Sequence, residues 1–204
     1  MCAKSADGSG DARILVKNAS EVIFAPDGTH VVYQTSGTAE RGLKVWNMKS
    51  NDPPRMLVLS TFELYPLGIS ADGRYVAYSS FKSGNPRIYL RRFPSGEGEW
   101  EIPALRSERG SWPGGGREFF AITGQGRDLL VSVVPVATGG SPTFGNPRVL
   151  FTTTNDRLSV FDGFVATGDG GRFLTVQRQH SESDLSGIVV VQNWWAEFQS
   201  RSAR

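Results

Sequence analysis

Charged side chains that could bind a ligand gather in the polar segments between the apolar stretches of this chain. Arginines offer forked donors to carboxylates, and a histidine beside acidic residues can change charge between about pH 5 and 8. The predicted ligand-binding set holds three arginines, one histidine and two carboxylates: Arg106, Arg109, Arg157, His180, Glu182 and Asp184. Mixed charge of this kind suits a peptide, a protein surface or a cell-wall fragment.

No pattern in the sequence reaches the specificity of a catalytic signature. The chain has no G-x-S-x-G nucleophile turn, no H-E-x-x-H zinc motif and no phosphate-binding loop. Ser79 and Lys82 have the S-x-x-K spacing, but they lie across the end of an expected strand, whereas that motif works on a helix. We therefore predict no catalytic residue, and whether the chain is an enzyme stays open.

Residues that hold metal ions are sparse. The chain has one cysteine, Cys2, and two histidines, His30 and His180, which are far apart in the sequence. A structural zinc site needs about four such ligands, and calcium takes about six to eight oxygens. We predict no metal site and no cofactor.

The chain is organised by a repeated turn and strand. Residues 69 to 80 read Ile-Ser-Ala-Asp-Gly-Arg-Tyr-Val-Ala-Tyr-Ser-Ser, in which a glycine turn precedes a strand with two differently occupied faces. Related phrases stand around Gly28, Gly116 and Gly170, so the copies are spaced 45, 43 and 54 residues apart. A propeller blade of four strands takes roughly 40 to 45 residues. The pattern predicts an all-β fold, a β-propeller of about four four-stranded blades.

These copies also support a family resemblance. The run Ser-Ala-Asp-Gly-Arg-Tyr-Val-Ala-Tyr at 70 to 78 resembles the WD40-like (PD40) repeats of TolB-like propellers. Residues 67 to 195 resemble the C-terminal part of the propellers attached to bacterial serine/threonine kinases and regulators. The marks are Arg-Ile-Tyr-Leu-Arg-Arg-Phe-Pro at 87 to 94, three glycines at 114 to 116, and Ile-Val-Val-Val-Gln-Asn-Trp-Trp at 188 to 195. The resemblance implies a binding or sensing module that is usually displayed in the periplasm or elsewhere outside the cytoplasm.

Strand patterns divide the chain into blades. The expected strands are 21–24, 30–36, 43–48 and 55–60; 65–70, 75–80, 87–93 and 99–103; 110–112, 118–123, 128–136 and 148–152; and 163–166, 172–179 and 187–193. One further strand at 12–16 is spare, and the last blade lacks one. We expect a disordered tail at 1–11, one propeller domain at 12–195 and a polar tail at 196–204.

The spare strand leaves two architectures open. In one, 12–16 pairs with 187–193 and closes a ring of four blades, which removes an unpaired sheet edge. In the other, the blades form an open arc whose apolar end faces are buried in a homodimer.

Charge and hydropathy exclude other partners. The 22 basic and 20 acidic residues are scattered along the chain, which gives no reason to expect nucleic acid. No run approaches the roughly 20 apolar residues of a membrane span, and the first ten residues lack the apolar core of a signal peptide. Because the resembling proteins are displayed outside the cytoplasm, the missing signal suggests either a truncated reading frame or a fragment of a longer chain, and localisation stays open.

The leading functional hypothesis is a non-catalytic propeller that binds a peptide, protein or cell-wall ligand. The ligand would lie where the loops between second and third strands meet the blade-to-blade crossings, which also carry Glu63 and Glu108. One alternative is a small propeller hydrolase or lyase that uses carboxylates at the channel mouth. Another is a structural segment that assembles with further copies.

Overall fold

The computed structural model describes residues 1–35, 41–103, 105–113, 116–125, 128–154, 164–167 and 171–175. These residues form seventeen strands and no helix, and all strand pairs are antiparallel. In this part of the chain there is accordingly no helix long and apolar enough to cross a membrane. The predicted all-β class is confirmed.

The strands form sheets that follow one another along the chain. The first sheet is β3 (Ala19–Phe24), β4 (His30–Thr35), β5 (Gly42–Asn47) and β6 (Arg55–Leu59), and the second is β7 (Leu64–Ile69), β8 (Tyr75–Ser80), β9 (Arg87–Arg92) and β10 (Trp100–Glu101). The third is β11 (Arg109–Ser111), β12 (Glu118–Gln125), β13 (Asp128–Ala137), β14 (Thr143–Phe144) and β15 (Arg148–Thr154). A last pair is β16 (Phe164–Ala166) and β17 (Phe173–Thr175).

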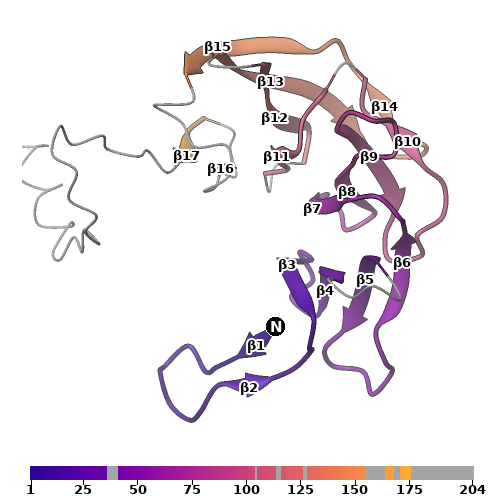
Figure 1. The fold of residues 1–204 in the computed structure, drawn as a ribbon, viewed down its shortest axis with the longest axis vertical. Helices are drawn as coiled ribbons and strands as arrows, with labels where there is room; N and C mark the ends of the chain where they lie inside the picture. Colours follow the sequence, from indigo (N-terminus) through magenta and orange to yellow (C-terminus); the bar gives the residue numbers. More distant parts are fainter. Residues whose placement is uncertain are drawn as a thin grey trace, which may run out of the picture.

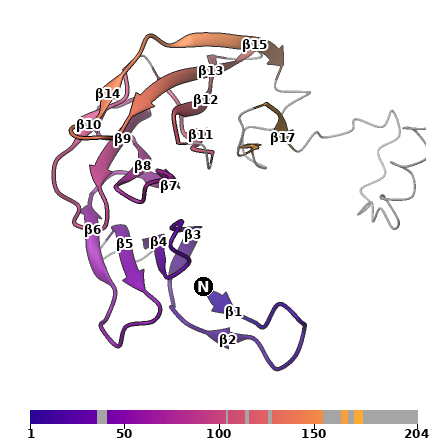
Figure 2. The same cartoon turned by 180° about the vertical axis from the view of Figure 1, so that it is seen from behind.

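The sheets fan out side by side along an arc. Figures 1 and 2 show β3, β7 and β11 on the inside of the arc and β6, β10 and β15 on the outside. Neighbouring inner strands lie against one another, β3 with β7, β7 with β11, and β11 with β16. This is the arrangement of propeller blades around an axis, as the repeats predicted.

Each hydrophobic core lies between two successive sheets. The two faces of β8 show this most clearly. Val76 and Tyr78 belong to a core shared with the first sheet, whereas Tyr75 and Ala77 belong to one shared with the third. The alternation read from 75–80 therefore places apolar side chains in two different cores.

The repeated Asp-Gly turns are closed by their own side chains. Gly28 and Gly73 have φ of 65° and 68°, in the left-handed region that glycine adopts without strain. In the first turn, Asp27 Oδ1 accepts hydrogen bonds from the backbone N–H groups of Thr29 (2.7 Å) and His30 (2.9 Å). The repeated aspartate is thus used inside the turn.

Two segments differ from the simple blade pattern. The long turn after β13 contains the short strand β14, which pairs with the end of β13 and was not predicted. At the N-terminus, β1 (Cys2–Ala3) pairs with β2 (Arg13–Ile14), so the expected tail and the spare strand form a hairpin. The predicted partner of 12–16, residues 187–193, lies outside the described residues. Ring closure and the predicted domain boundaries therefore remain predictions.

Candidate ligand-binding face

The inner strands β3, β7 and β11 all begin on the same side of the propeller, at one end of its axis. We call this end the loop face and define it by the described segments 60–64, 81–86 and 105–109. The opposite end, the turn face, carries the turns at 25–29, 47–50 and 70–74 and the long turn after β13. Because β3, β7 and β11 lie against one another and all begin at the loop face, the first residues of the three strands lie near one another.

Arg109 joins the three inner strands at this end. From β11, its Nη1 lies 3.1 Å from Glu21 Oε1 on β3, and its guanidinium lies 5.1 Å from the centroid of the Tyr65 ring on β7. Its Nε is buried and has no hydrogen-bond partner within the described part of the chain. The guanidinium therefore retains one unsatisfied donor.

Glu21 reaches Arg109 from an irregular backbone. The pairing of β3 with β4 shifts register between Ser20 and Val22, which marks a β-bulge at Glu21. Its φ of 34° lies in the left-handed region, which costs a residue other than glycine about 1 kcal/mol or more. Such conformations cluster where a side chain must be aimed at a site.

Carboxylates surround the hydroxyl of Tyr65. The hydroxyl donates a hydrogen bond to Glu63 Oε2 at 3.3 Å. Burial raises the pKa of Tyr65, and the nearby carboxylates of Glu63, Glu108 and Glu21 raise it further. The phenol therefore stays protonated. The loop face combines these acidic groups with the guanidinium of Arg109.

Arg106 lies on the same crossing but faces a different space. Its side chain is exposed and lines a hollow of about 180 Å³ beside Ser107, Thr123 and Leu129. The buried Ser107 hydroxyl accepts a hydrogen bond from the Arg109 backbone N–H at 3.1 Å and fixes the start of β11.

The structure therefore places two of the six predicted site residues. Arg106 and Arg109 lie at the loop face, while Arg157, His180, Glu182 and Asp184 lie outside the described residues. Sequence reasoning did not select Glu21 and Tyr65, because an isolated glutamate and tyrosine near strand starts carry no motif. Within the described residues, no group of three or more histidine, cysteine or acidic side chains is arranged to hold a metal ion.

A second charged cluster is centred on the carboxylate of Glu99. Glu99 Oε2 accepts hydrogen bonds from the Tyr78 hydroxyl (2.6 Å) and Arg91 Nη2 (2.9 Å), and Lys82 Nζ contacts Oε1. Lys82 also lies 3.9 Å from the centroid of the Tyr89 ring. Burial by itself would raise the pKa of Glu99, but these donors outweigh it and hold the pKa at about 2. Since both oxygens are occupied, the cluster serves the structure of the second sheet.

Comparison with solved structures identifies the class of fold. The chain superposes on TolB from Acinetobacter baumannii with a TM-score of 0.65 and 15% sequence identity, over 86% of this chain and 42% of TolB. A putative TolB from Agrobacterium tumefaciens gives a TM-score of 0.44 at 14% identity, over 67% of this chain and 66% of that protein. The fold is that of a TolB-like β-propeller, and the chain spans less than half the length of the Acinetobacter protein.

Sequence comparisons give no closer assignment. No family profile matches the chain, and no curated protein is similar to it at a significant level.

Proposed function

We propose that this chain is a non-catalytic binding module that engages a peptide, a protein segment or a cell-wall fragment through the loop face. The observation that supports the proposal most strongly is the junction of Arg109, Glu21 and Tyr65. Three successive sheets each contribute one side chain to it, and a buried guanidinium nitrogen is left without a partner. Side chains brought together from three blades form a rigid recognition surface.

The junction suits a ligand with both signs of charge. A ligand carboxylate would accept hydrogen bonds from Arg109, and a ligand that extends to the neighbouring hollow would place a second carboxylate against Arg106. A ligand ammonium or guanidinium group would meet the carboxylates of Glu21, Glu63 and Glu108 around Tyr65. A peptide backbone with acidic and basic side chains supplies both, so a peptide is the ligand that fits best.

Selection from a displayed library of random peptides tests this function. Peptides that bind the chain are measured by calorimetry against the wild type and against Arg109→Ala. Removing a charge-assisted contact from the centre of a binding site costs about 2 kcal/mol, so we expect affinity to fall at least about 10-fold.

Lys49→Ala is the matched control, because it removes an exposed positive charge at the turn face. Its affinity for the same peptides should equal that of the wild type. If Arg109→Ala binds the selected peptides as tightly as Lys49→Ala does, the loop face is not the binding site.

A second candidate function is supported by the first sheet. The alternation that places Ile23 against the core between the first two sheets turns Val22 and Phe24 to the opposite face, where they are 42% and 64% exposed. Exposed apolar side chains at the end of an arc suit a structural segment that assembles with another copy.

A further inference from the structure

A hollow of about 640 Å³ opens at the turn face, between the second and third sheets. Its lining includes Ala71 and Asp72 from the Asp-Gly turn of the second sheet, and Arg117, Val136 and Phe144 from the third. The volume lies within the roughly 300 to 1,000 Å³ of small-molecule sites. The hollow is separate from the loop face, because the two lie at opposite ends of the same strands.

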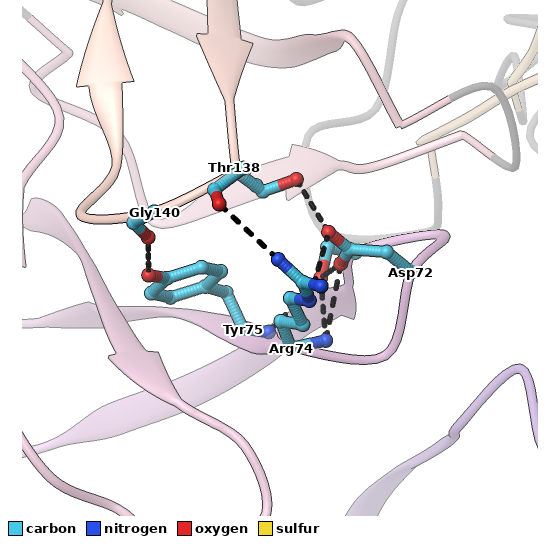
Figure 3. A network of polar contacts seen from close by, with 7 residues as sticks. Asp72, Arg74, Tyr75, Thr138 and Gly140 are labelled. Carbon is cyan, nitrogen blue, oxygen red and sulfur yellow. Dashed lines mark hydrogen bonds and ion pairs between the residues drawn. The ribbon is translucent and has the colours of Figure 1, made fainter.

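The wall of this hollow is the long turn after β13, and three contacts hold that turn against the second sheet. Thr138 Oγ1 donates a hydrogen bond to Asp72 Oδ2 at 2.7 Å, and Arg74 Nη1 donates one to the Gly139 carbonyl at 3.3 Å. The Tyr75 hydroxyl donates a third to the Gly140 carbonyl. Figure 3 shows Thr138 and Gly140 lying over Asp72, Arg74 and Tyr75. The wall is therefore fixed before a ligand arrives, which reduces the entropy lost on binding.

Apolar groups form most of the lining. Pro135, Val136 and Ala137 come from the end of β13, and Phe144 from β14 packs against the core between the second and third sheets. Gly145 lies so close to Pro135 that an added Cβ would approach the proline ring to 3.0 Å. A flat apolar group would find this surface complementary, because it would exchange water for carbon contacts.

Two charged residues line the hollow, and they differ in how many hydrogen-bond and ion-pair partners they already have. Asp72 accepts hydrogen bonds from Thr138, from the Ser70 hydroxyl (2.6 Å) and from the Arg74 backbone N–H (3.1 Å). Burial would raise the pKa of Asp72, but these bonds and the nearby Arg74 guanidinium lower it. Arg117 is exposed, and no other described residue forms a hydrogen bond or ion pair with its guanidinium. The charge left to be balanced in the hollow is therefore positive.

We propose that this hollow is a binding site for a small amphipathic anion. A flat apolar group would lie against Pro135, Val136 and Phe144, and a carboxylate, sulfonate or phosphate on the same molecule would bind the guanidinium of Arg117. A cationic ligand is disfavoured because Arg117 would repel it and the oxygens of Asp72 are occupied.

A matched pair of fluorescent probes tests the site. 8-Anilinonaphthalene-1-sulfonate and N-phenyl-1-naphthylamine share the same aromatic frame, but only the first carries a negative charge. In titrations of the full chain, we expect Arg117→Ala to weaken binding of the sulfonate about 10-fold or more and to leave the neutral probe nearly unchanged. Ala137→Trp, which fills the hollow from an exposed position, should weaken both probes.

Phe24→Ser serves as a control, because Phe24 is an exposed apolar side chain outside the hollow to which a naphthalene would also bind. It should leave sulfonate binding at the site unchanged. Circular dichroism and thermal melts establish that each variant is folded, and Thr143→Trp replaces Ala137→Trp if that variant is not. The proposal is overturned if Arg117→Ala binds the sulfonate as the wild type does, or if Phe24→Ser abolishes its binding while the filled hollow does not.

Discussion

Glu99 shows how a single carboxylate ties parts of one sheet together. Its partners come from β8 (Tyr78), from β9 (Arg91) and from the loop between them (Lys82). The same contact raises the pKa of Tyr78, whose burial already does so. Arg109, by contrast, has one carboxylate partner and an unsatisfied nitrogen. Both carboxylate oxygens of Glu99 have partners, whereas the Nε donor of Arg109 has none.

Glu99→Gln should destabilise the fold in a pH-dependent way. Because the folded-state pKa of about 2 lies below the ordinary value of 4.5, ionised Glu99 stabilises the fold above about pH 4.5, and this contribution is lost as the pH falls toward 2. The side chain is 29% exposed, so we expect a loss of about 1 to 2 kcal/mol at pH 7.

Urea unfolding of both proteins at pH 7, 4 and 2.5 measures the difference, which should shrink with each step. Glu97→Gln, at an exposed position two residues away, is the control and should match the wild type. A difference that stays constant across the pH series would contradict the role given to the Glu99 carboxylate.

At the scale of the elements, each inner strand lies close both to its neighbouring strand and to the next sheet, which limits the size of its side chains. Gly110 in β11 lies against the ring of Phe119 on β12, which is fully buried. A Cβ on Gly110 would approach two ring carbons of Phe119 to 2.6 Å. Residue size at this point therefore limits how β11 can pair with β12.

Gly110→Ala should destabilise the protein by about 1 to 3 kcal/mol, because the added methyl group overfills the site. Gly139→Ala is the matched control, since a Cβ there meets no atom within 4 Å. Thermal or urea unfolding compares the two variants. Equal stability of both with the wild type would show that β11 is free to move away from the Phe119 ring.

The regular strands could be predicted from the sequence, and the features that build the sites could not. Repeated glycine turns and apolar alternation placed β8 at its observed bounds, and most other strands begin within two residues of the expected position. The bulge at Glu21 depends on how β3 pairs with β4, and the two-residue strand β14 is too short for an alternation to show. Arg106 and Arg109 could be placed at the loop face because blade topology alone fixes where the crossings lie.

At the scale of the whole molecule, the blades form an arc whose first and last sheets both expose apolar side chains. Val22 and Phe24 are exposed at one end, and Val149 and Phe151 on β15 and Val165 on β16 are exposed near the other. No sheet of the described residues closes on itself. Apolar side chains at both ends favour contact between copies.

We expect this chain to self-associate as its concentration rises, and light scattering measures the mass directly. Replacing Val22 and Phe24 with serine should shift the particle toward the monomer, because it removes exposed apolar area from the first sheet. Leu59→Ser is the control, since that exposed side chain lies on the outer strand β6. A wild-type particle that stays strictly monomeric at high concentration would favour the closed ring of four blades.

The central claim, that the loop face binds the ligand, is tested most directly by hydrogen exchange of the full chain with a selected peptide bound. We expect slower exchange of backbone amides in the segments 60–64 and 105–109, where the crossings carry Arg106 and Arg109. Exchange at 70–74 and in the turn after β13 should stay unchanged, because those segments lie at the turn face. Slowing confined to the turn face, with none at the crossings, would show that the loop face is not the binding site.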